Sequence, residues 1–325
     1  MIPTSIMTLD RAGLRQLDGL IWAMIAAVAA TVLASLVLSD FRLVWASFLA
    51  PATTASVFAA GQWFYQTRRP DPRLAAALGS TAQVVAFAAV GAPLSYLAAS
   101  LNFPLYDHWF EAADKVFGLD WFGLFDWLKG HATAGFLLRL VYISLMPQTL
   151  VVILALSLAG HFAALRIFVL AFVFAALVTI AISAFWPAQG VWLLHGMTAS
   201  DGLSLPVSAT SWPVFLGLRD GTFRLLMAGG AEGIITFPSL HSALALILAV
   251  AFWPLPALRW IGVGLNTIMM VSIPIDGSHY FIDILAGLGI AVACLLAARA
   301  MVQRANQPRP ALAATPLQEL ATPSR

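Results

Sequence analysis

The chain has 325 residues, of which 61% are hydrophobic and 10% charged, and its formal net charge is +2 at pH 7. Soluble globular proteins have an apolar share of about 45 to 50% and a charged share of about 25%, so this composition excludes an ordinary soluble globule and favours a polytopic membrane protein. The small net charge and the lack of a basic cluster with stacking aromatics argue against a nucleic-acid partner, and the single cysteine, Cys294, excludes an intrachain disulfide.

Long apolar runs predict the fold class. A transmembrane helix needs about 20 consecutive apolar residues, so the sequence predicts an all-α polytopic membrane protein with about eight transmembrane helices. The first run is longer than the core of a cleaved signal peptide, so we expect it to be retained. The expected spans are residues 20–39, 42–65, 74–99, 133–158, 162–186, 240–257, 259–275 and 280–302.

The domain organisation follows from these runs. Residues 1–17 mix charged and apolar types and are expected to form an N-terminal cytoplasmic segment, followed by one transmembrane domain over residues 18–303. Residues 304–325 are rich in Pro, Ala, Gln and Thr, a composition typical of a disordered cytoplasmic tail. The oligomeric state is not readable from the sequence.

Lys and Arg predict the orientation, because they accumulate in cytoplasmic loops. Alternate loops receive eleven of these residues on one side and five on the other. The eleven are Arg11, Arg15, Arg68, Arg69, Arg73, Arg166, Arg259, Arg299, Arg304, Arg309 and Arg325, and the five are Arg42, Lys115, Lys129, Arg219 and Arg224. We therefore expect a protein of the cell inner membrane with both termini cytoplasmic and with the loops at His241 and His279 on the periplasmic or lumenal face.

The segment near residues 105–128 is too polar to span a membrane. Asp107, Glu111 and Asp114 share one helical face opposite an apolar one, which predicts an amphipathic helix at the outer interface. Tryptophans in and around it, among them Trp121, suit that level of the bilayer. We interpret the three carboxylates as a solvated face, with metal or sugar binding as the less favoured alternative.

Two further features upstream of the histidine motifs carry positive charge. Arg139 lies inside the fourth expected span, where it is either a snorkelling side chain or part of an anion site. The loop from residue 187 to residue 235 is the longest in the chain and contains Arg219 and Arg224 after a polar Ser/Thr tract. Loops of this length usually have a function, so we interpret it as a folded lid or substrate platform, with a plain outer loop as the alternative.

The first histidine motif opens the sixth expected span. Pro238 and Ser239 suit the start of a helix, the serine as its cap, and they place His241 in the first turn. Backbone N–H groups at a helix start are unpaired and the helix dipole favours an anion, so a phosphate suits this position.

The second motif is predicted to begin the last span. A turn at Gly277 and Ser278 precedes His279, and Asp283 follows one helical turn later on the same face. An aspartate that accepts from one imidazole nitrogen fixes the tautomer and leaves the other nitrogen as a nucleophile. The pattern predicts His279 as the nucleophile, Asp283 as its orienting group and His241 as the acid, with Ser239 and Ser278 as phosphate contacts.

Two other functions use the same residue types, metal binding and proton relay in a transporter. His241, His279 and Asp283 lack a cysteine partner, so a metal site is not favoured. We expect no metal and no cofactor, because positioning, cations and helix termini can stabilise the charge. A transporter with a His/Asp relay is the alternative from another class, and the lack of an internal repeat counts against it.

Phe237 to His241, followed by His279 to Asp283, resembles the type 2 phosphatidic acid phosphatase superfamily, and within it the inositol phosphorylceramide synthase-like branch. The resemblance implies a six-helix core from about residue 74 onward, His241 as proton donor and His279 as the phosphate-attacking residue. It implies a membrane lipid phosphatase or phosphotransferase acting on a phospholipid or lipid phosphate, or a transferase of a phosphoalcohol headgroup to a lipid alcohol.

The chain departs from the superfamily pattern in its cations. The superfamily's first motif, a Lys followed after six residues by Arg-Pro, is absent, Leu240 replaces the usual Gly, and Ile273 replaces the Arg expected before the second histidine. Since phosphate needs cationic partners, we expect them from elsewhere on the same face, from Arg219 first and then from Arg224 and Arg139.

Overall fold

The computed structural model describes residues 10–197, 211–229 and 234–307. The regular elements in these ranges are helices apart from a short parallel pair, β1 (Arg42–Leu43) with β2 (Leu225–Leu226). The helices are α1 (Arg11–Leu38), α2 (Trp45–Thr67), α3 (Pro72–Ser100), α4 (Asp107–Val116), α5 (Trp121–Lys129), α6 (Ala132–Ile143), α7 (Leu145–Leu158), α8 (Phe162–Phe185), α9 (Val191–Leu194), α10 (Ser211–Asp220), α11 (Leu240–Phe252), α12 (Arg259–Asp276) and α13 (Phe281–Ala305).

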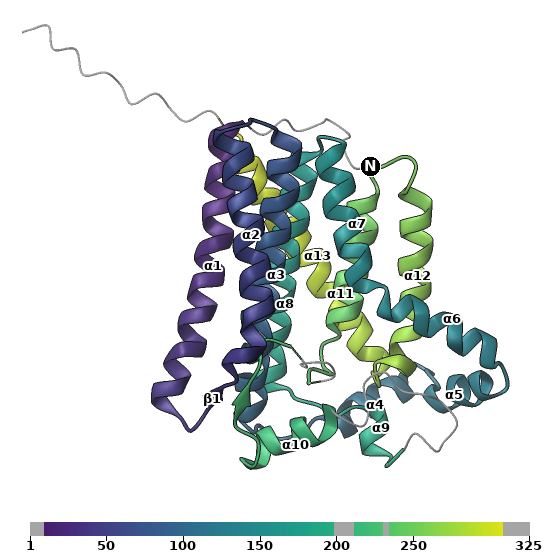
Figure 1. Ribbon diagram of the computed structural model, residues 1–325. Coiled ribbons are helices and arrows are strands. Elements are labelled where there is room, and N and C mark those ends of the chain that lie inside the picture. The colour runs from purple at the N-terminus through teal and green to yellow at the C-terminus, as the bar shows by residue number, and fades with distance from the viewer. Residues whose placement is uncertain (1–9, 198–210, 230–233, 308–325) are drawn as a thin grey trace, which may run out of the picture.

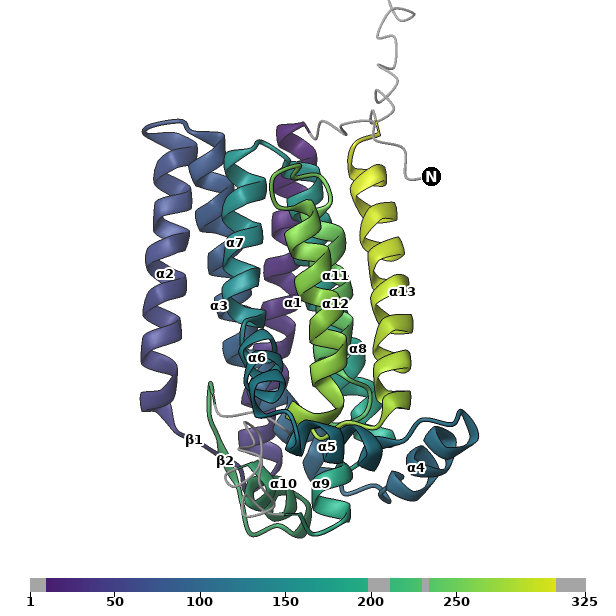
Figure 2. The ribbon, with the colours of Figure 1, turned by 90° about the vertical axis from the view of Figure 1, so that its right-hand side faces the viewer.

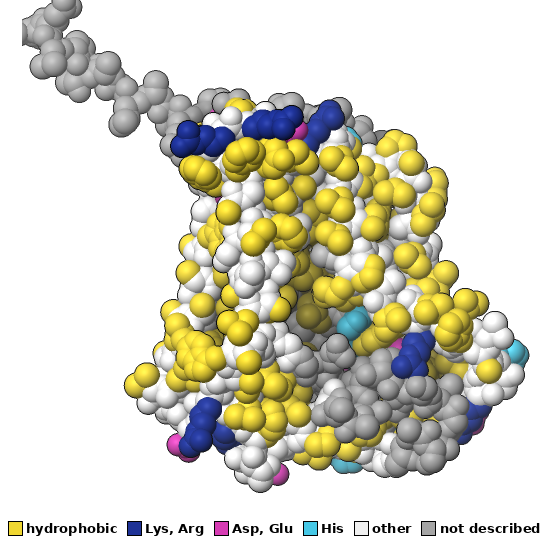
Figure 3. Space-filling model, in the orientation of Figure 1, with side chains coloured by type: hydrophobic (Ala, Val, Ile, Leu, Met, Phe, Trp, Pro, Cys, Tyr) yellow, Lys and Arg dark blue, Asp and Glu magenta, His cyan; other side chains and the backbone are white. Residues whose placement is uncertain are grey.

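The longer helices form a bundle, and several short helices lie at one end of it. In Figures 1 and 2, α4, α5, α9 and α10 gather at the lower end, whereas α1 begins and α13 ends at the upper end. On the face seen in Figure 3, hydrophobic side chains cover the middle and a row of Lys and Arg side chains crosses the upper end. This arrangement places the described ends of the chain opposite the short helices.

Four helices are long and apolar enough to cross a membrane: α1 from Ala12, α3, α8 and α13. The pair α6 and α7 adds a fifth candidate if it is one broken span. Helices α2, α11 and α12 coincide with the other three expected runs and lie alongside the candidates (Figure 2), but they do not meet the same test of length and composition. The structure therefore supports an integral membrane protein with four to five candidate spans.

The expected continuous span over residues 133–158 is broken. α6 and α7 meet at Ser144 with a bend of 49°. Pro147 follows in the first turn of α7, where it has no N–H to donate to the carbonyl of Ile143 and would clash with it in a continuous helix. The break directs α6 away from the bundle axis.

The predicted amphipathic helix near residues 105–128 is two helices, α4 and α5. Gly118 has a φ of +68°, a conformation that a side chain disfavours, and it ends the first helix. Asp120 then caps α5 by accepting from the N–H of Gly123 at 2.9 Å. A helix-ending glycine followed by a capping aspartate explains why one apolar and acidic pattern forms two elements.

The ends of the chain differ from the predicted boundaries. α1 begins at Arg11, inside the expected N-terminal segment 1–17, and α13 continues to Ala305, inside the expected tail 304–325. Residues 1–9 and 308–325 lie outside the described structure. The disorder of the tail therefore stays a prediction.

Arg166 belongs to a buried polar cluster and not to a cytoplasmic loop. Its side chain is 3% exposed and contacts Asp18 of α1 through Nη1 and Oδ1 at 2.9 Å. Nη1 also donates to Gln83 of α3 at 3.0 Å, and Gln83 donates to Asp18 at 3.1 Å. A buried charge is costly unless paired, so this cluster ties α1 and α3 to α8.

The described parts of the long loop are folded against the bundle. Within it, α10 packs through Phe215 and Leu218 into a buried cluster that includes Tyr96 of α3 and Phe41. β2 completes the contact by pairing with β1. The expectation of a folded platform agrees with these parts, whereas most of the Ser/Thr tract lies in residues 198–210, outside the described structure.

Candidate active site

The first histidine motif forms the start of α11, as predicted. Ser239 is fully buried and caps the helix, accepting from the N–H of Ser242 at 3.3 Å. His241 lies in the first turn, half-buried, and its ring stacks on that of Tyr142 from α6 with 4.2 Å between ring centres and 9° between planes. The parallel stack holds the imidazole ring of His241 against α6.

A close helix contact joins the two motifs. Ser242 Oγ donates to the carbonyls of Ser239 at 2.9 Å and of Ile284 in α13 at 3.2 Å. A Cβ at Gly287 of α13 would overlap Ser242 Oγ and the Ser239 carbonyl. The Ser239 N–H also donates to the carbonyl of Asp283 at 3.1 Å. A glycine therefore permits the approach that brings α11 beside the second motif.

The second motif lies just before α13, not in its first turn. α13 begins at Phe281, and the predicted turn is present, with Ser278 in the left-handed region at a φ of +58°. The N–H of His279 donates to the carbonyl of Pro274 at 3.1 Å, so the histidine still belongs to the end of α12. The left-handed residue reverses the chain, and His279 follows the reversal before the new helix starts.

His279 and Asp283 form the predicted pair. Imidazole Nδ1 lies 3.1 Å from Asp283 Oδ2, and the side chains are 4% and 0% exposed. Oδ2 also accepts from the N–H of Tyr280 at 3.0 Å, and imidazole Nε2 lies 3.4 Å from Ser239 Oγ. If the carboxylate accepts from Nδ1–H, Nε2 carries the lone pair, and it faces the helix start of the first motif.

The charge state of His279 follows from its burial. Burial, and to a smaller extent the nearby His241, lower its pKa to about 3, while a hydrogen bond with the backbone of Thr236 acts in the opposite direction. The imidazole is therefore neutral at physiological pH. A neutral imidazole is the form that can act as a nucleophile.

Segments far away in the sequence hold the loop around His279. Trp192 of α9 donates from its backbone N–H to Ser278 Oγ at 2.9 Å and from its indole to the carbonyl of Ile275 at 3.1 Å. The indole of Trp121 in α5 donates to the carbonyl of Pro274 at 3.0 Å. Each indole thus adds a second hydrogen bond to a carbonyl at the end of α12 that already accepts from a backbone N–H group, that of Ser278 or His279.

The prediction of a solvated acidic face on α4 was wrong for two of its three carboxylates. Asp107 and Asp114 are 2% and 4% exposed and bind the segment around His279. Trp109 of the same helix is 74% exposed, whereas Phe110 stacks on Phe237 inside the protein. Trp121, expected at the interface, is buried. The polar face is inside because the turn and helix start that it meets present unpaired N–H groups.

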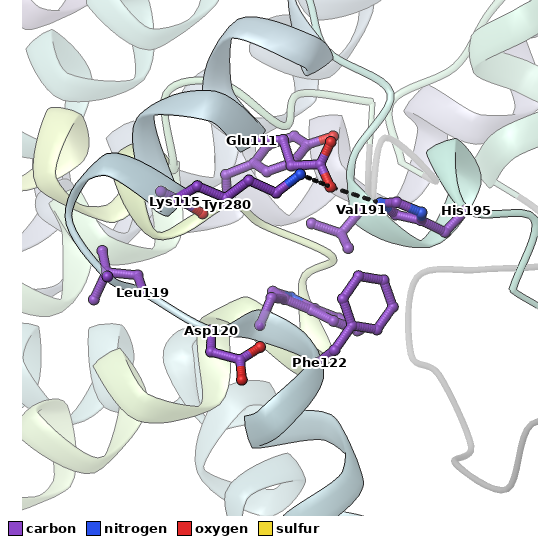
Figure 4. Close-up of a pocket in the computed structure, with 11 residues that line it drawn as sticks. Glu111, Lys115, Leu119, Asp120, Phe122, Val191, His195 and Tyr280 are labelled. Atoms are coloured by element: carbon purple, nitrogen blue, oxygen red, sulfur yellow. Dashed lines mark ion pairs between the residues drawn. The ribbon is translucent and has the colours of Figure 1, made fainter.

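Glu111 is the carboxylate of α4 that remains partly exposed. It pairs with Lys115 at 3.2 Å and with His195 at 3.3 Å. Figure 4 shows these three side chains beside a cavity of about 300 Å³, with Tyr280 also at its wall. This cavity lies next to the second motif, since Tyr280 directly follows His279 in the chain.

The three predicted phosphate-binding arginines lie in different surroundings. Arg219 donates to the Phe103 carbonyl at 2.8 Å, and burial lowers its pKa while Asp107 opposes this shift. Arg224 donates to the Leu218 carbonyl at 2.8 Å and has its guanidinium over the ring of Phe41. Neither hydrogen bond reaches a histidine motif, so their phosphate roles stay predictions.

Arg139 is closer to the second motif. Its positive charge acts on Asp276, the last residue of α12, which is 7% exposed. α6, which carries Arg139, packs against α12, and Tyr142 one turn further on stacks on His241. Arg139 thus has a link to both motifs, while the charge of Arg219 acts on Asp107, which binds Tyr280 of the second motif.

Sequence reasoning missed Asp107, Asp114, Trp121 and Trp192 as parts of the site. One signal was present: Asp107 and Asp114 are seven residues apart and so lie on one helical face. A second was Tyr280, which is not a capping residue type, so the start of α13 needed acceptors from elsewhere. Among the described residues, no three His, Cys, Asp or Glu side chains are grouped as a metal site requires.

Comparison with known proteins identifies the family. Residues 108–297, more than half of the chain, match the PAP2 superfamily, and this range contains both motifs and Arg139. The match does not distinguish a branch within the superfamily, and the search of curated proteins and that of solved structures each gave no match. The candidate spans and the paired motifs are what a membrane enzyme of this superfamily requires. The chain therefore belongs to the PAP2 superfamily of phosphatase-type membrane enzymes.

Proposed function

We propose that the protein is a membrane lipid phosphatase or phosphotransferase that acts on a phospholipid or lipid phosphate through a phosphohistidine at His279. One observation carries the proposal: Nδ1 of His279 lies 3.1 Å from a buried aspartate while Nε2 faces Ser239 at the start of α11. This is the arrangement that an oriented, neutral nucleophile beside an anion site requires.

The first chemical step forms the phosphohistidine. The Nε2 lone pair attacks phosphorus, the bond from phosphorus to the leaving oxygen breaks, and His241 gives its proton to that oxygen. Nδ1–H stays on the imidazole, and Asp283 stabilises the positive charge that the ring acquires. In the second step an acceptor hydroxyl gives its proton to His241 and attacks phosphorus, and the bond to Nε2 breaks.

The phosphate oxygens need stabilising charge during both steps. The start of α11 supplies backbone N–H groups and the positive end of a helix dipole, with Ser239 Oγ 3.4 Å from Nε2. Arg139 is the cation that we place first, because its charge already acts beside the second motif. Arg219, Arg224 and Ser278 remain further candidates. Positioning and charge suffice for this chemistry without a cofactor.

The acceptor is water or a lipid alcohol. His279 is 3% exposed, and a buried phosphohistidine is shielded from bulk water. This burial favours transfer of a phosphoalcohol headgroup to a lipid alcohol, the reaction of the inositol phosphorylceramide synthase-like branch, as the second candidate. Reaction in water labelled with ¹⁸O separates the two, since only hydrolysis places the label in released phosphate.

We also propose the membrane arrangement. With α6 and α7 as one broken span and with α2, α11 and α12 crossing as well, the helices make the eight expected spans. The motifs lie at the end of the bundle opposite the described chain ends (Figure 2), which accords with cytoplasmic termini and a periplasmic or lumenal site. Cysteine labelling from either side of sealed vesicles tests this orientation.

The proposed function is tested with purified full-length protein and ³²P-labelled phosphatidic acid in mixed micelles. We expect His279→Ala to lower turnover by at least about 10³-fold and to remove an acid-labile ³²P label from the protein. His108→Ala, which changes an exposed histidine, is the matched control. Activity is expected to persist in chelator. Retained turnover or retained label in His279→Ala contradicts the proposal.

A further inference from the structure

We propose that Asp107 and Asp114 of α4 are positioning residues that hold the segment on both sides of His279 so that its Nε2 faces the phosphate site. The inference rests on the proposed function, because it assigns a role in forming the phosphohistidine. It goes beyond the paired motifs, because α4 belongs to neither of them.

Asp114 binds the start of the helix that follows His279. Its Oδ2 accepts from the N–H of Phe281 at 2.8 Å, and its Oδ1 accepts from the N–H of Ile282 at 2.9 Å. These are the first two N–H groups of α13, which have no partner within the helix. A carboxylate at a helix start is also favoured by the helix dipole. Asp114 thus caps α13 from a position 167 residues earlier in the chain.

Asp107 binds the side chain next to His279 and the segment that holds the turn. Its Oδ1 accepts from the Tyr280 hydroxyl at 2.9 Å and from the N–H of Gly190 at 3.0 Å. Gly190 is the N-cap of α9, and the next residue, Val191, donates its N–H to the carbonyl of Ser278 at 3.1 Å. Asp107 therefore fixes Tyr280 directly and Ser278 through α9.

Together the two carboxylates control every residue that flanks His279. Ser278 and Tyr280 are held through Asp107, and Phe281 and Ile282 through Asp114. A nucleophile must approach phosphorus within a narrow range of distance and angle, and a displacement of about 1 Å can cost about 10²-fold in rate. The carboxylates thus act on the reaction through the main chain of His279.

The charge of these carboxylates adds a second contribution. Asp107 binds the Tyr280 side chain and Asp114 binds the N–H groups of Phe281 and Ile282, so both carboxylates lie next to the segment of His279. Attack through Nε2 leaves the ring of His279 positively charged, and two further negative charges beside it stabilise that charge in a water-poor site. Replacement by the neutral amide is therefore expected to slow formation of the phosphohistidine even where the segment keeps its shape.

Glu111 provides the matched control. It lies on the same face of the same helix and carries the same charge, but its partners are Lys115 and His195 beside the cavity (Figure 4). Among the described residues, no hydrogen bond joins it to the His279 segment. Glu111→Gln, Asp107→Asn and Asp114→Asn make the same chemical change. Tyr280→Phe removes only the hydroxyl that donates to Asp107. It tests the same hydrogen bond if an aspartate variant fails to fold.

The experiment measures steady-state turnover and the rate of ³²P labelling in rapid quench, with the labelled phosphatidic acid named above and with p-nitrophenyl phosphate. We expect Asp107→Asn and Asp114→Asn to lower kcat and the labelling rate about 10- to 100-fold, with KM changed less than about threefold. The factor by which the labelling rate falls should be the same for both substrates, although their leaving groups differ. Tyr280→Phe should lose about three- to tenfold, and Glu111→Gln less than twofold.

Thermal unfolding of each variant separates positioning from loss of fold. The inference is overturned if folded Asp107→Asn and Asp114→Asn label as fast as Glu111→Gln, or if Tyr280→Phe has wild-type rates while the aspartate variants are unfolded. The proposed function fails separately, through His279→Ala. If His279→Ala is inactive and unlabelled while the α4 variants react normally, only the role of α4 is wrong.

Discussion

The two histidine motifs are built in opposite ways. Ser239 and His241 are placed by their own helix, since the serine caps α11 and the histidine follows in its first turn. His279 instead lies in a segment whose neighbours are bound by α4, α5 and α9, and its side chain is 4% exposed. The first motif is thus a local structure, and the second depends on segments far away in the sequence.

This difference indicates a division of labour. A group that exchanges protons with the leaving oxygen and the acceptor oxygen needs access to the substrate, and its own helix is enough to place it. His241 fits this role because it is half-buried at the start of α11. A nucleophile that forms a covalent bond needs a fixed direction of attack, and His279 is held on every side. Changes at the two motifs should therefore have different kinetic signatures.

The largest expected effect separates the two histidines by leaving group. His241→Ala should lower turnover of phosphatidic acid about 10²- to 10⁴-fold, because the alkoxide then leaves without a proton. With p-nitrophenyl phosphate, whose leaving group needs no proton, the loss in the rate of phosphohistidine formation should fall below about tenfold. Rapid-quench rates of the first step with both substrates test this, because steady-state turnover also includes the second step, in which His241 accepts a proton. An equal loss for both contradicts the assignment of His241 as the acid.

The second prediction concerns the contact that brings the motifs together. Gly287→Ala should lower the free energy of unfolding by about 1 to 3 kcal/mol and reduce activity, because the added methyl group overlaps Ser242 Oγ and the Ser239 carbonyl. Gly289→Ala on the same helix has open space and is the control. Unfolding in detergent measures both. Equal stability of the two variants would show that α11 and α13 are not in close contact.

The third prediction uses the burial of His279. Its folded-state pKa of about 3 lies below the unfolded value of 6.5, so the unfolded chain binds a proton that the folded chain excludes. The associated stability is complete above pH 6.5 and is lost as the pH falls toward 3, by up to about 1.4 kcal/mol per unit. Denaturant unfolding between pH 7 and 4 should show a smaller slope in His279→Gln, whereas His108→Gln should keep the wild-type slope.

The smallest effect concerns the stack on His241. Tyr142→Leu should lower turnover about three- to tenfold through loss of the parallel ring contact, which corresponds to about 0.5 to 1.5 kcal/mol. Tyr142→Phe keeps the ring and should lose less. The ratio of the two rates is the measurement. If both variants lose the same activity, the ring is not what orients the imidazole.

Much of the fold was predictable because hydrophobic length is a local property. Every expected apolar run corresponds to a helix or, for residues 133–158, to the bent pair α6 and α7. Pro147 lies at the bend between α6 and α7, and Gly118 ends α4. Both residues can be read from the sequence, but the long apolar and amphipathic patterns around them predicted continuous helices. Arg166 was assigned to a cytoplasmic loop because the positions of the apolar runs do not show that it pairs with Asp18 inside the bundle.

For the site, the sequence by itself determined the capped start of α11, since a cap is set by helical geometry. It also predicted the His279–Asp283 pair, although His279 lies before α13 and not within it. Only the tertiary structure decided that Asp107 and Asp114 face inward. An amphipathic helix at a membrane surface can direct its polar face to water or to unpaired N–H groups of the protein, and its own sequence is the same in both cases. The segment after His279, about 170 residues later in the chain, supplies the donors that bury the polar face of α4.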